Sequence, residues 1–375
     1  MKKEFTVTPW EVSGDIDYDR LIKEFGVSKL DDKILERIKK HTKDLHFMLR
    51  RKVFFAHRDM TWILDEYEKG NKFFLYTGRA PSGGVHLGHL LPWVFTKWLQ
   101  DKFDVELWFQ FPDEEKFLFK RELSFDDVEK YLNDNMLDVI ALGFDPKKTH
   151  FIIDTKHADL MYKGACEVAK RITFSTVKAS FGLKDDANIG EIFYTSMQAV
   201  PAFLPSILKK KNIPCLIPHA VDQDPHFRLT RDILPKIGYY KPASIQCIFL
   251  PPLSGTSGKM SASGAEEQVI YTTDTPEQVK SKIMKHAFSG GQGSVEEHRK
   301  KGGNPDIDVS YQYLRMFFEP DDKKLEKIYN DYKSGKMLTS ELKAYLADKI
   351  NLFLKEHQKN RELAKKQLDK FIFKP

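Results

Sequence analysis

Short apolar runs alternate with helical stretches through the middle of the chain. The β-prone run FFLYT (73–77) and the similar run VELWFQ (105–110) flank LLPWVFTKWLQ, which has the apolar spacing of a helix. Further strand-like runs follow at HFIID (150–154), PCLIP (214–218) and SIQCIFL (244–250). This order predicts an α/β fold with a doubly wound parallel sheet, Rossmann-like, over residues 66–272, and a mostly helical insertion at about 113–200.

The pattern changes on both sides of this sheet. The first 65 residues combine a candidate short hairpin, TVTPWEVSG, with helical stretches rich in Lys and Arg. Near the other end, apolar residues recur at spacings of three, four and seven, which indicates one stripe on a long helix. These residues are Leu338, Leu342, Tyr345, Leu346, Ile350, Phe353 and Leu354. We therefore expect an amino-terminal extension over 1–65 and an all-helical domain over 273–375.

Composition narrows the class of protein. The chain has 375 residues, 41% of them hydrophobic and 30% charged, as in ordinary globular proteins. Its three cysteines lie far apart and predict reduced thiols rather than a disulfide framework or a zinc site. No run is long enough to cross a bilayer, and the amino terminus lacks the apolar core of a secretory signal. We therefore expect a cytoplasmic protein with no membrane partner.

Positive charge is concentrated in the last forty residues. Residues 336–375 carry ten Lys and Arg against five Asp and Glu, a net of +5 out of +6 for the whole chain. Such a surface is either a solvated helix face or a site for a polyanion. If the apolar stripe faces inward, the basic side chains should mostly be exposed; they are Lys343, Lys355, Lys359, Arg361, Lys365 and Lys366. Alternatively, the helix packs back against the sheet domain and leaves polyanion contacts to about 280–335.

A glycine-rich loop, TGRAPSGGVHLGH, joins the first strand of the sheet to its first helix. The free N–H groups and positive dipole end of that helix favour a phosphate at the loop. Gly88 has no Cβ, so a flat base can lie against the first turn, and His86 and His89 can stabilise charge on phosphorus. Taken alone, the loop could equally be a simple turn before a capped helix.

A second loop, GTSGKMSAS (255–263), follows the last predicted strand. It is rich in Gly and Ser and carries one lysine, Lys259. A mobile lysine that closes over a pyrophosphate leaving group is what adenylyl transfer requires. Two phosphate-type loops that flank one doubly wound sheet favour that chemistry over a chance combination of turns.

HLGH and KMSAS match the two signature motifs of the class I aminoacyl-tRNA synthetases. TGRAPSGGVHLGHLLP resembles the version in the tryptophanyl-tRNA synthetase family, in its eukaryotic and archaeal branch. The resemblance covers nearly the whole chain, because it also includes VTPWEV, DYDRLI, FFAHRDM, FTKWLQD, AVDQDPHFRLTRD, KHAFSGGQGSVEEHRKKGGN and MLTSELK. Ala262 departs from the general class I form, in which many members carry a second lysine.

The resemblance implies a two-step reaction. L-Tryptophan would react with ATP to give an adenylate and pyrophosphate, with Mg²⁺ on the phosphates and no metal site in the protein itself. The 2′-hydroxyl of the terminal adenosine of tRNA(Trp) would then take the acyl group. The family also implies a homodimer whose residues 273–375 bind the anticodon, with tRNA rather than DNA as the nucleic acid.

Matching positions assign roles to individual residues. The catalytic residues implied are His86, His89 and Lys259. The ATP-binding residues implied are Arg79, Pro81, Ser82, Gly88, Met260, Ser261 and Ser263. The tryptophan-binding residues implied are Tyr76, Gln110, Glu115, Gln198 and Gln223, although Glu114 lies close enough to take the place of Glu115. Without the family, each of these polar residues could have a purely structural role.

Three other functions remain open at this point. A tyrosine–tRNA ligase shares the fold, but its pocket commonly holds an aspartate for the phenol, whereas Gln110 stands here. A small-molecule nucleotidyltransferase could use the same loop, but it would keep its full reaction without residues 280–375. A non-catalytic interaction protein would have no physical reason to keep His86, His89 and Lys259 together.

Overall fold

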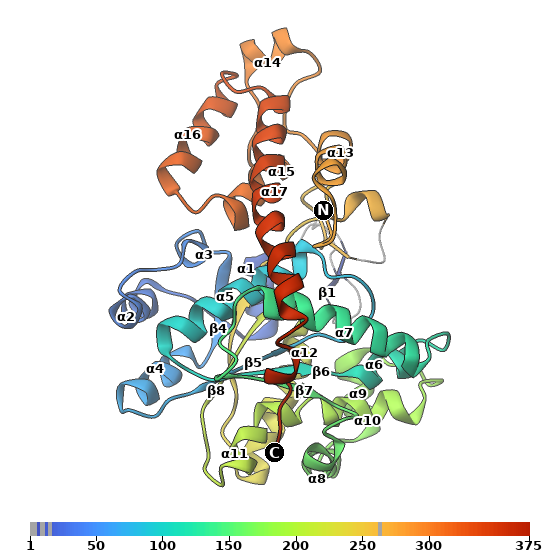
Figure 1. Ribbon diagram of the computed structural model, residues 1–375. Helices are drawn as coiled ribbons and strands as arrows, with labels where there is room; N and C mark the ends of the chain where they lie inside the picture. The colour runs from blue at the N-terminus through green and yellow to red at the C-terminus, as the bar shows by residue number, and fades with distance from the viewer. Residues whose placement is uncertain (1–5, 8–11, 14–16, 262–264) are drawn as a thin grey trace.

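A computed structural model of the protein describes residues 6–7, 12–13, 17–261 and 265–375. At its centre lies a seven-stranded sheet in the order β3-β4-β9-β8-β5-β6-β7 (Figure 1). The strands are β3 (Ser28–Lys29), β4 (Phe54–Arg58), β5 (Phe74–Gly78), β6 (Leu107–Phe111), β7 (Thr149–Ile153), β8 (Cys215–Ala220) and β9 (Ala243–Cys247). The five strands from β9 to β7 are parallel, which confirms the predicted doubly wound α/β class.

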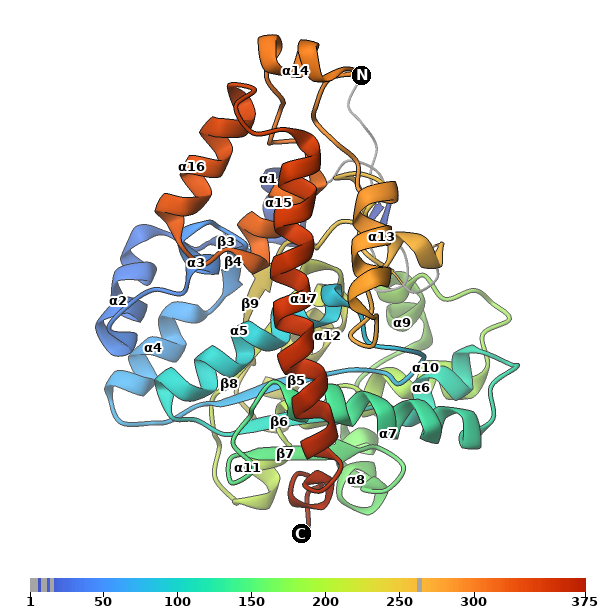
Figure 2. The ribbon, with the colours of Figure 1, turned by 45° about the horizontal axis from the view of Figure 1, so that its top comes forward.

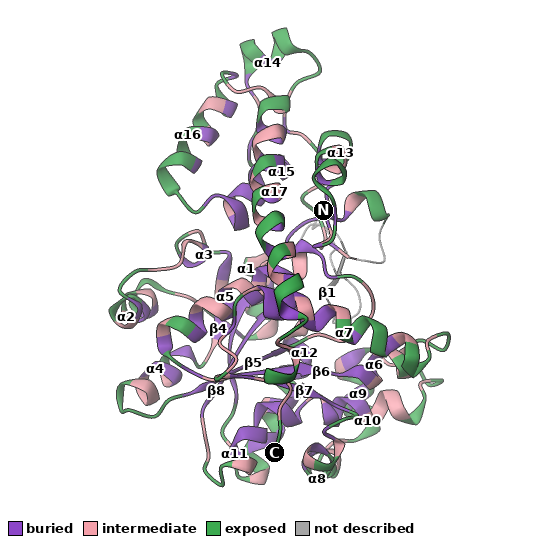
Figure 3. Cartoon of the chain, viewed as in Figure 1, coloured by how far each residue is buried: buried purple, intermediate pink, exposed green. Residues whose placement is uncertain are grey.

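Both faces of the parallel strands are buried under helices, so their sequences are nearly continuous apolar runs. Leu75, Leu107 and Phe109 pack in one core with α5 (Leu87–Phe103). Tyr76 and Trp108, which point the opposite way, belong to a second core. The helices on that side are α8 (Ala158–Ala169), α9 (Phe174–Phe181), α10 (Ile189–Met197), α11 (Leu204–Leu208) and α12 (Asp224–Ile233). In Figure 3 the central strands are accordingly coloured as buried.

The sheet is not wholly parallel, because the first 65 residues contribute to it. Strand β4 pairs antiparallel with β9, and β3 pairs antiparallel with β4. The sequence predicts only a hairpin and helices there. The helices are α1 (Tyr18–Phe25), α2 (Asp32–Thr42), α3 (Phe47–Arg50) and α4 (Met60–Glu68). Strand β1 (Thr6–Val7) pairs antiparallel with β2 (Val12–Ser13) where the sequence predicts a hairpin, whereas Trp10 lies outside the described residues.

The region predicted as a helical insertion contains α6 (Asp113–Phe119) and α7 (Phe125–Ala141), with β7 between them and the later helices. After residue 272 the described chain is helical. Its helices are α13 (Pro276–His286), α14 (Val295–Lys301), α15 (Val309–Tyr313), η5 (Leu314–Phe318), α16 (Asp322–Lys333), α17 (Thr339–Ala364) and η6 (Leu368–Lys370). None of the helices in the described residues combines the length and apolar character needed to cross a membrane.

Helix α17 runs from this helical region down along the sheet domain and packs against α7 (Figures 1 and 2). Its predicted apolar stripe is buried at Leu342, Leu346, Ile350 and Leu354. Beyond the helix, residues 371–373 lie along the outer edge of β7. There the Phe151 N–H donates to Phe371 O at 2.7 Å, and the Phe373 N–H donates to Phe151 O at 3.0 Å.

Two of the six basic side chains predicted to be exposed on the tail are instead buried. Lys343 is 9% exposed and Arg361 is 7% exposed. Lys343 Nζ donates to Met284 O at 3.2 Å, and Arg361 Nη2 lies 2.5 Å from Asp134 Oδ1 on α7. The prediction failed here because acidic and carbonyl partners on other helices lie opposite these positions. The other four, Lys355, Lys359, Lys365 and Lys366, are exposed.

Candidate active site

A cavity of about 550 Å³ opens at the carboxyl ends of the parallel strands, between β5 and β8 where the strand order reverses. This is the usual position of a ligand in a doubly wound sheet. The predicted site residues that line it are Tyr76, Arg79, Ser82, His86, Gly88, His89, Gln110, Glu115, Gln198, Gln223, Lys259, Met260 and Ser261. Pro81 is buried outside this lining, and Ser263 lies outside the described residues.

The first signature loop is built around the start of α5. His86 is the residue before the helix, and its backbone nitrogen lies 3.2 Å from His89 Nδ1. The two imidazole rings stack with centroids 3.5 Å apart. A Cβ on Gly88 would lie 3.1 Å from the His86 ring and 3.4 Å from Met260 Cβ. The two signature loops approach each other at position 88, so a larger residue there would require the His86 ring or Met260 to shift.

Arg79 supplies positive charge to this loop. Its Nη1 donates to His89 Nε2 at 2.6 Å, and its Nε donates to Asn135 Oδ1 at 2.5 Å. Removal from water lowers the pKa of Arg79 to about 10, an effect that the Asp138 carboxylate opposes. Burial, together with the Arg79 charge, also holds the pKa values of His86 and His89 well below the ordinary value. Both imidazoles are therefore neutral at pH 7, beside a guanidinium that contacts no carboxylate among the residues that the structure describes.

The lysine of the second loop reaches the same cavity. Lys259 Nζ donates to Asp222 Oδ2 at 2.6 Å, and its side chain is 24% exposed. Asp222 follows β8, in the short turn η2 (Val221–Gln223). Together, Arg79 and Lys259 place two positive charges around one end of the cavity, which suits a polyphosphate.

A chain of hydrogen bonds crosses the other end of the cavity. The Tyr76 hydroxyl donates to Gln110 Oε1 at 2.6 Å, and Gln198 Nε2 donates to the Tyr76 oxygen at 3.1 Å. Gln110 Nε2 is in turn held by Asp154 Oδ2 at 2.7 Å. The amide of Gln110 is thus oriented with its oxygen toward Tyr76. This end of the cavity offers acceptor atoms among apolar side chains, which suits a ring with one N–H donor.

The structure separates the two adjacent glutamates. Glu115 lines the cavity and accepts from the Tyr194 hydroxyl at 2.8 Å, whereas Glu114 does not line it. Although burial raises the pKa of Glu115, the ion pair with Lys116 at 2.6 Å keeps the net pKa below the ordinary value. Burial raises the pKa of Glu114 to about 7. Of the two, Glu115 is therefore the charged carboxylate that faces the cavity.

Sequence reasoning missed several side chains that hold the predicted ones. Asn135 contacts Arg79, and Asp154 contacts Gln110. Tyr194 contacts Glu115, and Asp222 contacts Lys259. Asp154 ends the predicted run HFIID, and Asp222 precedes Gln223 in AVDQD, so both positions were visible as strand ends. Asn135 and Tyr194 lie within helices, where nothing in the sequence marks them.

Within 6–7, 12–13, 17–261 and 265–375, no group of three or more His, Cys, Asp or Glu side chains is arranged to hold a metal ion.

Comparison with known proteins identifies close relatives over the whole chain. A family model described as "tRNA synthetases class I (W and Y)" matches residues 68–355. The tryptophan–tRNA ligase of Sulfolobus acidocaldarius is 54% identical over all of this chain and 96% of its own, and that of Pyrococcus furiosus is 50% identical over all of this chain and 95% of its own.

Solved structures give the same result. The tryptophanyl-tRNA synthetase of Plasmodium falciparum is 41% identical, with a TM-score of 0.89, over 96% of this chain and 98% of its own. That of the archaeon Aeropyrum pernix K1 is 29% identical, with a TM-score of 0.88, over 96% of this chain and 97% of its own.

Proposed function

Because the chain belongs to the class I tRNA synthetases of the tryptophan and tyrosine type, we propose that it is a tryptophan–tRNA ligase. It activates L-tryptophan with ATP and transfers the acyl group to tRNA(Trp) in the cytoplasm. The observation that carries the proposal is a cavity in which two loops, each with a cationic side chain, face the Tyr76–Gln110 acceptor pair. Two tryptophan–tRNA ligases that share 54% and 50% sequence identity with the full chain support it.

In the first step, a tryptophan carboxylate oxygen bonds to the α-phosphorus of ATP while the bond to the pyrophosphate oxygen breaks. The carboxylate is already ionised at pH 7, so no general base is needed. Arg79 and Lys259 face the phosphates and neutralise the charge that moves onto the leaving pyrophosphate. His86 and His89 stabilise the pentavalent phosphorus through their ring nitrogens.

The substrate amino acid lies across the other end of the cavity. Glu115 binds its ammonium, because this carboxylate is charged and faces the cavity. Gln198 and Gln223 hold the ammonium and carboxylate, and the indole N–H donates to the Tyr76–Gln110 pair. Mg²⁺ enters as the complex with ATP, since one or two carboxylates plus substrate phosphates are its usual ligands.

The Tyr76–Gln110 pair also distinguishes tryptophan from tyrosine. The phenol of tyrosine both donates and accepts, and a carboxylate is a suitable partner for it. The carboxylate that contacts this pair, Asp154, lies behind Gln110 and accepts from its amide N–H, outside the cavity lining. ATP–pyrophosphate exchange measured with each amino acid tests the assignment. Exchange that depends on tyrosine rather than tryptophan would contradict it, as would activation with no charging of tRNA(Trp).

We propose that the exposed lysines of the tail approach tRNA phosphates. Lys355 and Lys359 lie on the outer side of α17 and Lys366 follows it, and all three are exposed. Reversing the three to Glu is expected to weaken tRNA binding, and each lost phosphate contact should reduce the slope of log K against log salt by about 0.7–0.9. Exchange with tryptophan and ATP should stay unchanged, because this surface lies outside the cavity.

A matched control for this experiment is available on α2, where Lys33, Lys39 and Lys40 are also exposed. Reversing these three changes the net charge by the same amount at a different place. If both triple variants lower the salt slope equally, the effect is one of overall charge. If neither does, the tail is a solvated surface and the tRNA lies elsewhere.

We also propose that the protein is a homodimer formed through the helical insertion. Large apolar side chains are exposed there: Ile189 is 84% exposed and Phe174 is 43% exposed. Nearby, the Phe117 and Phe125 rings stack with centroids 4.1 Å apart and are also exposed. Large apolar side chains left exposed to solvent are typical of an interface. Light scattering of wild type and Ile189→Asp tests this, since a monomeric wild type would rule it out.

A further inference from the structure

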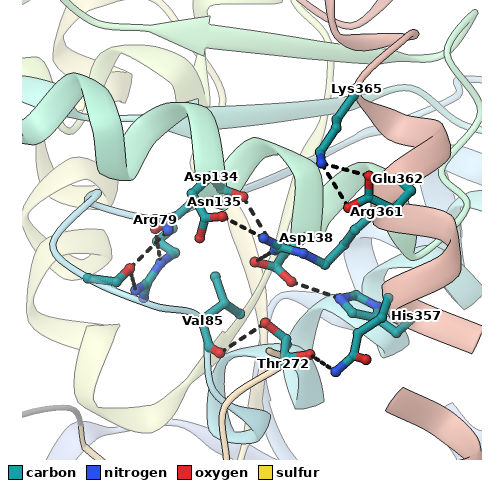
Figure 4. A network of polar contacts seen from close by, with 12 residues as sticks. Arg79, Val85, Asp134, Asn135, Asp138, Thr272, His357, Arg361, Glu362 and Lys365 are labelled. Atoms are coloured by element: carbon teal, nitrogen blue, oxygen red, sulfur yellow. Dashed lines mark hydrogen bonds and ion pairs between the residues drawn. The ribbon is translucent and has the colours of Figure 1, made fainter. Parts of the chain in front are cut away.

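Helix α17 is joined to the first signature loop by buried polar contacts that the proposed reaction does not use (Figure 4). His357 and Arg361 project from α17 onto α7, where both meet Asp138. His357 Nε2 donates to Asp138 Oδ1 at 2.8 Å, and these two side chains are 2% and 0% exposed. Arg361 also pairs with Asp134, one turn earlier on α7. A buried carboxylate with two such partners fixes the position of α7 relative to α17.

The same stretch of α7 holds the loop between β5 and α5. Asn135, next to Asp134 and fully buried, donates from Nδ2 to Gly83 O at 2.9 Å. Its Oδ1 accepts from Arg79 Nε, as described above. The amide of Asn135 therefore sets both the backbone of the loop and the direction of the Arg79 guanidinium. Figure 4 shows Asp134, Asn135 and Asp138 between Arg361 and Arg79.

A second connection reaches the loop from its other side. Gln358 Nε2, on α17, donates to Thr272 O and Asp274 O, both at 2.9 Å. The Thr272 N–H and hydroxyl in turn donate to Val85 O at 2.9 and 3.2 Å. Thr272 is 1% exposed, so this contact is shielded from water. One helix thus supports both Arg79 and the backbone immediately before His86.

We propose that α17 positions the ATP-binding loop, with Arg361 and Gln358 as positioning residues for ATP and not for tryptophan. The tryptophan end of the cavity, at Tyr76 and Gln110, has no contact with either residue among those described. A small displacement of Arg79 would weaken contact with phosphate, because such contacts depend on geometry. Since α17 also belongs to the helical region proposed to meet tRNA, this arrangement couples the two ends of the molecule. The inference rests on the proposed function.

The test uses the full chain and three variants. Arg361→Met removes the charge but leaves Asp138 paired with His357, and Gln358→Met removes the second connection without stranding a buried charge. Lys349→Met is the matched control: it lies on the same helix and breaks a pair at 3.0 Å with Glu319, which is 2% exposed, within the helical region. The readouts are the KM for ATP and the KM for tryptophan in pyrophosphate exchange, direct ATP binding by calorimetry, and Tm.

We expect Arg361→Met to raise the KM for ATP about tenfold, within the usual range for coupling between sites, with less than about a twofold change in the KM for tryptophan. Gln358→Met should act in the same direction, and Lys349→Met should lower Tm only. An unchanged KM for ATP in both variants would overturn the inference, as would an equal rise in the control or in the KM for tryptophan. If wild type shows no exchange with tryptophan, the proposed function fails, whereas ATP binding still tests the role of α17.

Discussion

Replacing Lys259 with alanine is expected to slow adenylate formation by about 10²-fold or more, the usual effect of losing one preorganised charge. The lysine lines the cavity beside both histidines and is held by Asp222 at 2.6 Å. Ala262 stands where many class I members carry a second lysine, so Lys259 is the one lysine of this motif that can neutralise the leaving group. Tryptophan affinity should change little, because Lys259 lies at the opposite end from Gln110. Single-turnover formation of the adenylate measures the first effect, and equilibrium binding of tryptophan measures the second.

Lys349→Ala provides a control with closely similar surroundings. Its side chain is 25% exposed, against 24% for Lys259, and it pairs with a buried carboxylate outside the cavity. Its activation rate should remain within a small factor of wild type. If Lys259→Ala activates tryptophan as fast as this control, the lysine has no role in the chemistry.

Analogues of tryptophan in which sulfur or carbon replaces the indole nitrogen are expected to lose roughly 10⁴-fold in kcat/KM. They cannot donate to the Tyr76–Gln110 pair, so the hydrogen bond expected from the indole N–H is lost in a buried part of the cavity. A ring fluorine keeps the N–H and should cost far less. The measurement is pyrophosphate exchange with each analogue at limiting concentration.

The Tyr76→Phe variant tests whether this loss of efficiency is due to the hydrogen bond. The variant keeps the ring that packs in the second core but removes the hydroxyl that contacts Gln110 and Gln198. Its preference for tryptophan over the sulfur analogue should fall markedly. Equal efficiency of wild type with all of these analogues would show that the shape of the pocket alone selects the substrate.

The parts of the fold that sequence predicted well are those with local signals. The runs at β5, β6, β7, β8 and β9 are mostly buried on both faces and rich in apolar residues, and each was predicted as a strand. Strand β4 was missed because five residues among helical stretches carry too little periodicity to separate strand from helix. Its pairing with β9 is set by residues far away in the chain.

The residues of the candidate site also differ in whether a local sequence signal marks them. His86, His89 and Lys259 stand in loops whose Gly and Ser content marks them, and the structure brings all three to one cavity. Asn135 has no such mark, since its role depends on α7 lying beside Arg79. Arg361 was predicted to be exposed because the sequence does not show that α7 lies beside α17. An apolar stripe predicts which face of a helix is buried, but it says nothing about which charged neighbours a second helix will present.

The neutral state of His86 and His89 has a thermodynamic consequence. Their pKa values are held well below the ordinary value by burial and by Arg79. A bound phosphate opposes the effect of Arg79, because its negative charge favours the protonated imidazoles, so we expect both pKa values to rise and protons to be taken up from the buffer as the nucleotide binds. By linkage, ATP affinity then increases as the pH falls toward that of the bound imidazoles. Calorimetric heats of ATP binding should accordingly differ between buffers of different ionisation enthalpy, in proportion to the protons absorbed.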